Sequence, residues 1–268
     1  MGEHGTWFDY LNRFTWWQSF NEKAANVLGR KKPFLLLFQE SHFTLTHVLV
    51  TLLVLAFVIW GALVFNKATE SGDRGLVPPR RMNLRNFFEV MAESVYGMVE
   101  GALGEKNGRR FFPLVGTLWL FILLGNLIGL FPGFVSPNDT LKTNVALALT
   151  VFVVTHVVGI REHGVGAYFK HFLGPSPWLA PLIFPIELVS HIARPVSLSL
   201  RLMGNMMADH KVVFAFFTLV PLFVPIPFLA LGLLVCVIQA IVFCTLTMVY
   251  IGMAVEHEDG GEHAAAHH

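Results

Sequence analysis

Long apolar runs separated by short polar stretches dominate the pattern of this chain. Because a helix needs about 20 mostly apolar residues to cross about 30 Å of hydrocarbon, runs of this length predict membrane spans. We expect about five of them, at about 43–65, 111–131, 144–160, 178–219 and 228–255. The sequence therefore predicts an all-α polytopic membrane protein with a membrane domain at 41–256.

The last two spans are predicted to form a long helical hairpin. No charged residue occurs from Val212 to Val255, and this stretch is too long for one helix that crosses the membrane upright. Proline interrupts helical hydrogen bonding, so the chain is expected to turn at Pro221, Pro225 and Pro227. Pro195 is expected to kink the helix before this turn.

Three segments outside the spans have their own patterns. Residues 83–103 alternate apolar and acidic positions at helical spacing, which predicts an amphipathic helix on the membrane surface or against another subunit. Residues 1–40 are rich in Trp and Phe and are expected to lie at the headgroup level or outside the membrane. Residues 257–268 form a polar, histidine-containing tail, and the loop at 132–142 is expected to be a turn.

Composition supports the membrane class. The chain is 54% hydrophobic and only 14% charged, whereas soluble domains have about 25% charged residues. A net charge of +1 without a basic stripe excludes nucleic acid as a partner. No glycine-rich phosphate loop and no Cys/His cluster with metal-ligand spacing occur, so we expect no cofactor and no bound metal.

One polar stripe occurs in the fourth predicted span, and it contains most of the candidate chemistry. Its members are 4, 3, 7, 4 and 4 residues apart, which places them within about 80° of one another on a helix. His210 directly follows the stripe and points elsewhere. The six residues of the stripe are Glu187, His191, Arg194, Arg201, Asn205 and Asp209.

Ionisable groups at the centre of a bilayer cost about 2.5–3.5 kcal/mol each, so they are expected to face each other, a partner subunit or water. An interfacial helix whose stripe faces solvent is the simpler alternative. Arg201 stays protonated and can act only as a fixed charge, whereas carboxylates and histidines can bind and release protons. The stripe therefore predicts a proton-handling membrane subunit.

Further candidates lie on other spans. Gly232, Gln239 and Tyr250 lie near one face of the last helix, and Asn126 is the only strongly polar residue of the second span. His156 in the third span is expected to be a packed or interfacial histidine. Gly232, Tyr250 and Asn126 are secondary candidates, because a single such position on an apolar helix is a weak signal. His191 and Arg194 of the stripe are ranked with them.

Three stretches resemble subunit a of the bacterial rotary F-type ATP synthase. They are RPVSLSLRLMGNM at 194–206, TNVALAL at 143–149 and TLTMVYI at 245–251, together with Asn126 and Gln239. The resemblance covers most of residues 40–255. It implies a stator that grips a rotating ring of c subunits and provides two offset half-channels for protons.

The resemblance also implies residue roles and partners. Arg201 is the essential arginine that faces the ring carboxylate, Asn205 and Gln239 are the polar residues beside it, and Glu187 is a channel-lining acid. The implied partners are the c-ring, the stator-stalk subunit b, the F1 sector and the lipid bilayer. A subunit of this kind performs no covalent chemistry, so it is not an enzyme by itself.

Two positions depart from the best-known family pattern. Where many members have a glutamate this chain has His210, and where they have a histidine on the last helix it has Gly232. We interpret a small Gly232 opposite a bulky His210 as a compensating exchange, with Asp209 as a candidate carboxylate. His210 and Asp209 are accordingly candidate relay residues.

Lysine and arginine are more numerous in the loops at 66–110 and 161–176 than on the other side, which favours those loops as cytoplasmic. The resemblance implies the same orientation, with a periplasmic N-terminus and a cytoplasmic C-terminus in a bacterial inner membrane. An independent proton or cation channel or transporter is the alternative function. A membrane oxidase with histidine boxes would need several clusters, and only one partial motif occurs, at His263, His267 and His268.

Overall fold

The computed structural model describes residues 18–19, 22–23, 45–69, 84–131, 134–166, 168, 180–219 and 225–255. These residues contain helices and no strand, which confirms the predicted all-α class. The N-terminal segment 1–40, apart from two short helical pieces, and the tail 257–268 lie outside the described residues. The main elements are α2 (Leu45–Thr69), α3 (Leu84–Leu130), the 3-10 helix η3 (Pro137–Asp139), α4 (Leu141–His163), α6 (Ala180–Leu219) and α7 (Pro225–Val255).

Among the described helices, three are long and apolar enough to cross a membrane: Phe88–Leu130, Leu141–His163 and Ile226–Val255. A shorter apolar helix occupies His47–Leu63. The long helix α6 does not belong to this group, because its polar stripe lowers its hydropathy. The composition of these helices agrees with a polytopic membrane protein, and the five individual crossings stay predictions.

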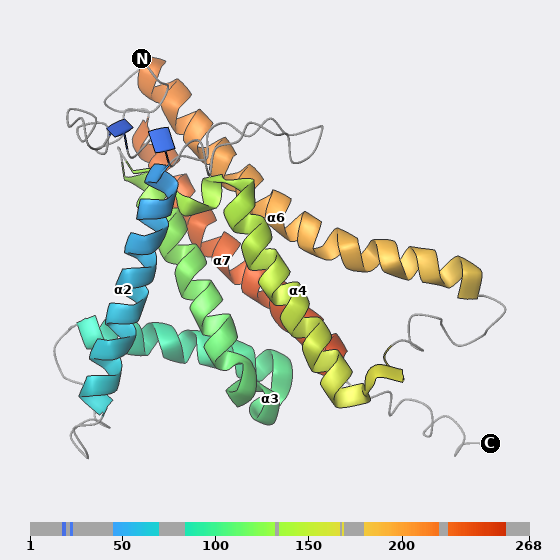
Figure 1. Cartoon of the computed structure of the whole chain (residues 1–268). Helices are drawn as coiled ribbons and strands as arrows, with labels where there is room; N and C mark the ends of the chain where they lie inside the picture. Colours follow the sequence, from blue (N-terminus) through green and yellow to red (C-terminus); the bar gives the residue numbers. More distant parts are fainter. Residues whose placement is uncertain are drawn as a thin grey trace.

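The amphipathic segment and the second predicted span form two arms of one helix, α3. They meet at Gly104, whose φ of 76° and ψ of 165° are not helical, and only glycine adopts such a positive φ without strain. The two arms run in clearly different directions (Figure 1). The predicted amphipathic helix at 83–103 therefore ends where expected, but the break is confined to Gly104 and helix resumes at once.

The arm before Gly104 is amphipathic, as its pattern predicts. It buries Val95 and Val99 and exposes Glu93. It also contacts α2, where the rings of Phe57 and Phe88 lie 6.0 Å apart between centroids. This arm therefore braces the cluster of apolar residues that α2 and the second arm of α3 share.

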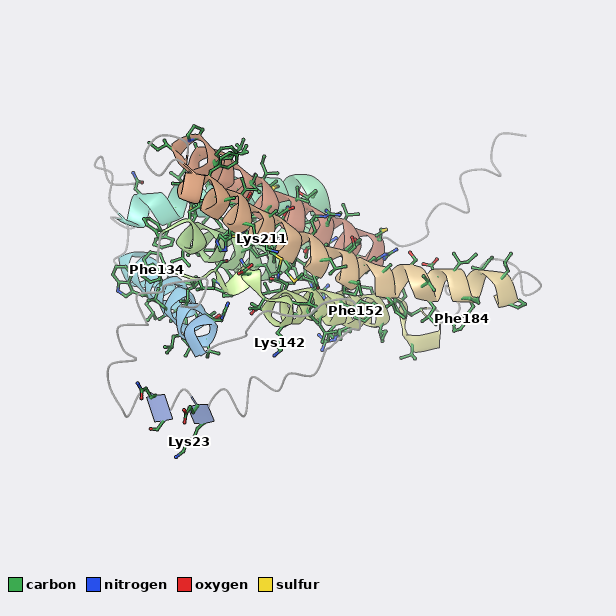
Figure 2. All side chains as sticks on the ribbon, turned by 90° about the horizontal axis from the view of Figure 1, so that it is seen from above. Lys23, Phe134, Lys142, Phe152, Phe184 and Lys211 are labelled. Atoms are coloured by element: carbon green, nitrogen blue, oxygen red, sulfur yellow. The ribbon has the colours of Figure 1, made fainter. Side chains whose placement is uncertain are left out.

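Helices α6 and α7 form the predicted hairpin. Pro185 and Pro195 lie inside α6, each removes a backbone hydrogen bond, and Figure 1 shows the helix axis bending between its two ends. Near the turn, the rings of Phe216 on α6 and Phe228 on α7 stack with centroids 4.1 Å apart. The start of α6 around Phe184 extends beyond the other helices (Figure 2).

The core lies where the second arm of α3 packs against α7, while α4 packs against both α6 and α7. Its fully buried side chains include Val115 and Ile122 on α3 and Phe243 and Met248 on α7. These apolar contacts hold α7 in place behind α6. The position of the polar stripe is therefore set by α4 on one side and α7 on the other.

Candidate functional site

The polar stripe of α6 lies at the border between the buried and the exposed face of that helix. Leu198, Leu202 and Met206 face the bundle, whereas Arg201 and Asn205 are exposed. The stripe residues therefore differ in their surroundings along the helix. Three regions follow one another: a polar cavity, the exposed Arg201 and a cluster at the η3 end.

The first region is a cavity of about 200 Å³ between α4, α6 and α7. Glu187, His191 and Arg194 of the stripe all line it, and Tyr250 of α7 lies on its wall. His191 Nδ1 lies 3.4 Å from Glu187 Oε1 and 3.0 Å from the Glu187 carbonyl oxygen. The structure thus brings three stripe residues and one secondary candidate together around one space.

The electrostatics of this cavity are set by Arg194. Its guanidinium lies 5.2 Å from the centre of the Tyr250 ring, an arrangement that favours a cation over the aromatic face. Tyr168, which follows α4, also lines the cavity. Burial raises the pKa of the Tyr168 phenol and Arg194 partly offsets this, so the hydroxyl stays protonated and can both donate and accept.

His156 belongs to the same cavity. Its Nδ1 lies 2.8 Å from the Phe152 carbonyl oxygen and its ring lies 3.9 Å from that of Phe152. The centroid of the His191 ring lies 5.5 Å away. His156 is partly packed, as expected, but it also faces the stripe, so two imidazoles lie next to each other in this space.

The second region is the exposed Arg201. Among the described residues it has no ion-pair or hydrogen-bond partner. The residues around it on the exposed face of α6 are small, which leaves the helix backbone open to close approach. These small residues are Ala193, Ser197, Gly204 and Ala208.

One turn further on, Asn205 Nδ2 donates a hydrogen bond of 2.7 Å to Gln239 Oε1. Gln239 lies on α7 and is only 4% exposed. The bond fixes the relative position of the two helices at the level of Arg201. The structure therefore brings together the polar pair that the resemblance places beside the arginine.

The third region surrounds His210, whose ring turns toward α3. Its Nε2 lies 3.1 Å from the Gly129 carbonyl oxygen and its Nδ1 lies 3.8 Å from Asp139 Oδ2. Asp209 has one buried carboxylate oxygen without a hydrogen-bond partner in the described part of the chain. His210 thus has polar neighbours on α3 and η3, whereas one carboxylate oxygen of the adjacent Asp209 has no hydrogen bond within the described residues.

Gly232 does not take the place that we expected opposite His210. A side chain built on Gly232 would meet Leu130 at 3.8 Å and nothing else within 4 Å. Because His210 lies about 100° away from the stripe on the helix, it contacts α3 rather than α7. The small residue that makes room for His210 is Gly129, where a Cβ would lie 3.0 Å from Nε2.

Asn126 belongs to a buried polar cluster and not to the stripe. Its Oδ1 accepts a hydrogen bond of 2.7 Å from Asn138 Nδ2, and Asn144 Nδ2 donates to the Asn138 carbonyl oxygen at 2.7 Å. Ser199 of α6 in turn lies 3.3 Å from the Asn144 carbonyl oxygen. The cluster ties η3, α3, α4 and α6 together behind the stripe.

Sequence reasoning missed Asp139 as a neighbour of His210 and Tyr168 as lining of the cavity, and it expected His156 only to be packed or interfacial. Asp139 lies in a segment that we interpreted only as a turn. A charged side chain in a short turn between two apolar spans is the signal that could have identified it. For Tyr168 the sequence carries no comparable signal, and for His156 the sequence does not show that His191 of α6 lies next to it.

Comparisons with known proteins show which family this chain resembles. The family described as "ATP synthase A chain" matches residues 32–252. "ATP synthase subunit a 2" from Syntrophotalea carbinolica is 51% identical over 218 residues, which are 81% of this chain and 88% of that protein. "ATP synthase subunit a" from Trichlorobacter lovleyi is 46% identical over 78% of this chain and 84% of that protein.

A further relative, "ATP synthase subunit a" from Geobacter sulfurreducens, is 45% identical over 77% of this chain and 86% of its own length. The matched region contains α2 to α6 and α7 up to Gly252, and hence the whole stripe, His210 and η3. The resemblance that the sequence motifs indicate is thereby confirmed. This chain belongs to the family of ATP synthase A chains.

Proposed function

We propose that this chain is the stator subunit of the membrane sector of an F-type ATP synthase and that it couples proton flow to the rotation of a c-ring. Arg201 is the fixed charge that meets the ring carboxylate. The cavity on one side of it and the His210 cluster on the other belong to two separate half-channels. The observation that carries the proposal is the exposed Arg201 between these two polar regions.

The exposure of Arg201 supports a facing subunit. An arginine that faces lipid costs about 2.5–3.5 kcal/mol even on a lenient scale, so a partner with a complementary charge must cover it. The small residues Ala193, Ser197, Gly204 and Ala208 surround it on the exposed face, and small residues let helices approach closely. A ring of helices that carry a carboxylate is a partner of this kind.

The spacing along α6 supports two half-channels. Arg201 lies seven residues after Arg194 and nine before His210, which corresponds to about 10 Å and 14 Å along a helix. Glu187 and His191 at one end and His210 at the other can bind and release protons, whereas Arg201 cannot. A proton can therefore pass from one side to the other only on the rotating carboxylate.

An independent channel or transporter fits these observations less well. Such a protein would join its two polar regions within one chain, whereas the exposed Arg201 separates them. We place the chain in a bacterial inner membrane with the η3 end toward the periplasm and the cavity toward the cytoplasm. Subunit b and the F1 sector are the other proposed partners, and the subunit performs no catalysis of its own.

Substituting Ala208 by leucine tests the ring-facing surface. Ala208 is exposed on the Arg201 face of α6, so a larger side chain is tolerated within this chain but obstructs a closely packed partner. We expect Ala208→Leu to lower ATP-driven proton pumping in inverted membrane vesicles by about tenfold, which corresponds to about 1.4 kcal/mol of lost coupling and lies within the cost of overpacking.

The matched control is Ala146→Leu on α4, which makes the same change at another exposed alanine. We expect normal pumping for this variant and normal amounts of both variant subunits in the membrane. Equal pumping by the Ala208→Leu variant and the wild type would show that no partner packs on this face. That result would contradict the proposed function.

A further inference from the structure

A carboxylate outside the stripe, Asp139 in η3, faces the ring of His210. We propose that Asp139 and His210 form one proton-binding pair at the η3 end and that this pair transfers protons to or from the stripe. The inference rests on the proposed function, because it names the residues that handle the proton in the half-channel on that side of Arg201. It assigns a role to Asp139, which the sequence motifs do not include.

The hydrogen bonding of His210 carries the argument. Nε2 lies 3.1 Å from the Gly129 carbonyl oxygen, and a carbonyl oxygen can only accept, so Nε2 holds a hydrogen. In a neutral imidazole Nδ1 is then an acceptor. Nδ1 lies 3.8 Å from Asp139 Oδ2, and an ionised carboxylate also accepts only. The two groups are therefore complementary only when the pair holds an additional proton.

That proton resides either on Nδ1, as an imidazolium next to a carboxylate, or on the carboxyl of Asp139. Its transfer breaks one N–H bond and forms one O–H bond, or the reverse, and no other atom changes. The distance of 3.8 Å is an ion-pair distance, so a small side-chain movement brings the two atoms within hydrogen-bond range. The pair can thus take up a proton at one of its two side chains and release it from the other.

Both partners are held in place. At Gly129 a Cβ would lie 2.6 Å from Met206 Cε and 3.0 Å from His210 Nε2, so only glycine lets the imidazole reach the backbone carbonyl. Ser136 caps η3 by accepting a hydrogen bond from the Asn138 backbone at 3.2 Å. The Asp139 backbone N–H donates to the Ser136 carbonyl oxygen at 3.2 Å. This bond fixes the position of the Asp139 backbone and hence the point from which its side chain extends.

The other charged groups nearby are Asp209 and Lys211, which flank His210 on α6, and Lys142 in the first turn of α4. Asp209 and Asp139 both place a carboxyl group near His210, whereas Lys211 is exposed. Asp209 belongs to the stripe and His210 does not. The pair therefore connects η3 with the stripe by way of two adjacent residues of α6.

The test uses the full ATP synthase in sealed membrane vesicles and measures ATP synthesis driven by an imposed proton gradient. Asp139→Asn keeps the size of the side chain but cannot hold the proton. We expect the rate to fall by about tenfold or more, since a positioned acid or base contributes about 10²–10⁴-fold to a proton transfer. Asp139→Glu should restore most of the rate, and Glu93→Gln on the exposed face of α3 is the matched control.

Two further readouts separate a proton-binding role from a structural one. The defect of Asp139→Asn should grow as the pH on the proton-source side rises, because protons become scarcer there and the variant lacks the carboxylate that helps the pair to hold one. The double variant Asp139→Asn/His210→Gln should be no slower than the slower single variant, because the two residues act as a unit. His210→Gln still donates to the Gly129 carbonyl oxygen but cannot titrate.

An Asp139→Asn variant with the wild-type rate and pH profile would overturn the inference, and so would single effects that multiply in the double variant. If Asp139→Asn does not accumulate in the membrane, His210→Gln decides alone: a wild-type rate overturns the pair and a loss supports it. Arg201→Ala is measured in parallel. If the Arg201→Ala variant still makes ATP from the proton gradient, the proposed function fails. If Arg201→Ala is inactive but Asp139→Asn has the wild-type rate, only the Asp139–His210 pair is refuted.

Discussion

Replacement of Arg201 by alanine is expected to abolish ATP-driven proton pumping while the complex still assembles. Arg201 is exposed and has no hydrogen-bond or ion-pair partner in the described part of the chain, so its removal leaves the packing of α6 intact. One preorganised charge contributes about 10²–10³ to a rate. We therefore expect pumping in inverted vesicles to fall by about 100-fold or more.

The same substitution should increase the passive leak of protons through the membrane sector. Each proton that crosses 100 mV releases about 2.3 kcal/mol, and without the fixed charge this free energy is lost as heat. Arg161→Ala, at an exposed arginine near the end of α4, is the matched control and should pump normally. Persistent pumping by an assembled Arg201→Ala complex would mean that the arginine has only a structural role.

The second large effect is expected from Asn138→Leu, which keeps the approximate size of the side chain but removes its hydrogen bonds. Asn138 is fully buried, and its Nδ2 donates to Asn126 Oδ1 at 2.7 Å and to the Ile122 carbonyl oxygen at 3.3 Å. Each buried group left without a partner costs about 1–3 kcal/mol. The total of several kcal/mol should sharply lower the amount of subunit in the membrane.

The measurement is the amount of the subunit in washed membranes and the temperature at which the solubilised complex dissociates. Asn107→Leu is the matched control, because Asn107 is only partly buried and has no side-chain hydrogen bond in the described structure. We expect wild-type amounts for Asn107→Leu. A normal amount and normal dissociation temperature for Asn138→Leu would show that the buried polar cluster does not hold η3 against α3.

The polar stripe could be predicted from the sequence because it depends only on helical periodicity. Spacings of 3, 4 and 7 residues put Glu187, His191, Arg194 and Arg201 on one side of a helix without any knowledge of the fold. The break at Gly104 was also signalled locally, although the immediate return to helix was not. These are short-range properties that neighbouring residues determine.

The partners of the stripe could not be predicted in the same way. His210 bonds to a backbone carbonyl 81 residues away in the sequence, and a backbone atom leaves no pattern in the chain. We expected Gly232 to make room for His210, but Gly129 does so. The difference arises because the rotation of α6 about its axis is set by packing against α4 and α7, which periodicity alone does not specify.

The polar cluster around Asn126 shows the same limit. Asn126 was recognised as the one strongly polar residue of its span, but its donor, Asn138, lies buried in a segment that we expected only to be a turn. A buried amide needs a hydrogen-bond partner. The sequence indicates that Asn126 requires one but does not show which residue it is. The structure supplies that partner through the folding of η3 onto α3.

The central claim is that water reaches the stripe from opposite faces of the membrane on the two sides of Arg201. The test places single cysteines in a background that lacks the buried Cys236 and Cys244. Silver ions are added to one face of sealed vesicles and bind any cysteine that water reaches from that face. A cysteine that has bound silver is protected from later alkylation, and this protection is the readout. We expect silver to protect Thr155→Cys in the cavity only from the cytoplasmic face and Asp139→Cys only from the periplasmic face. Protection of both cysteines from the same face would contradict it.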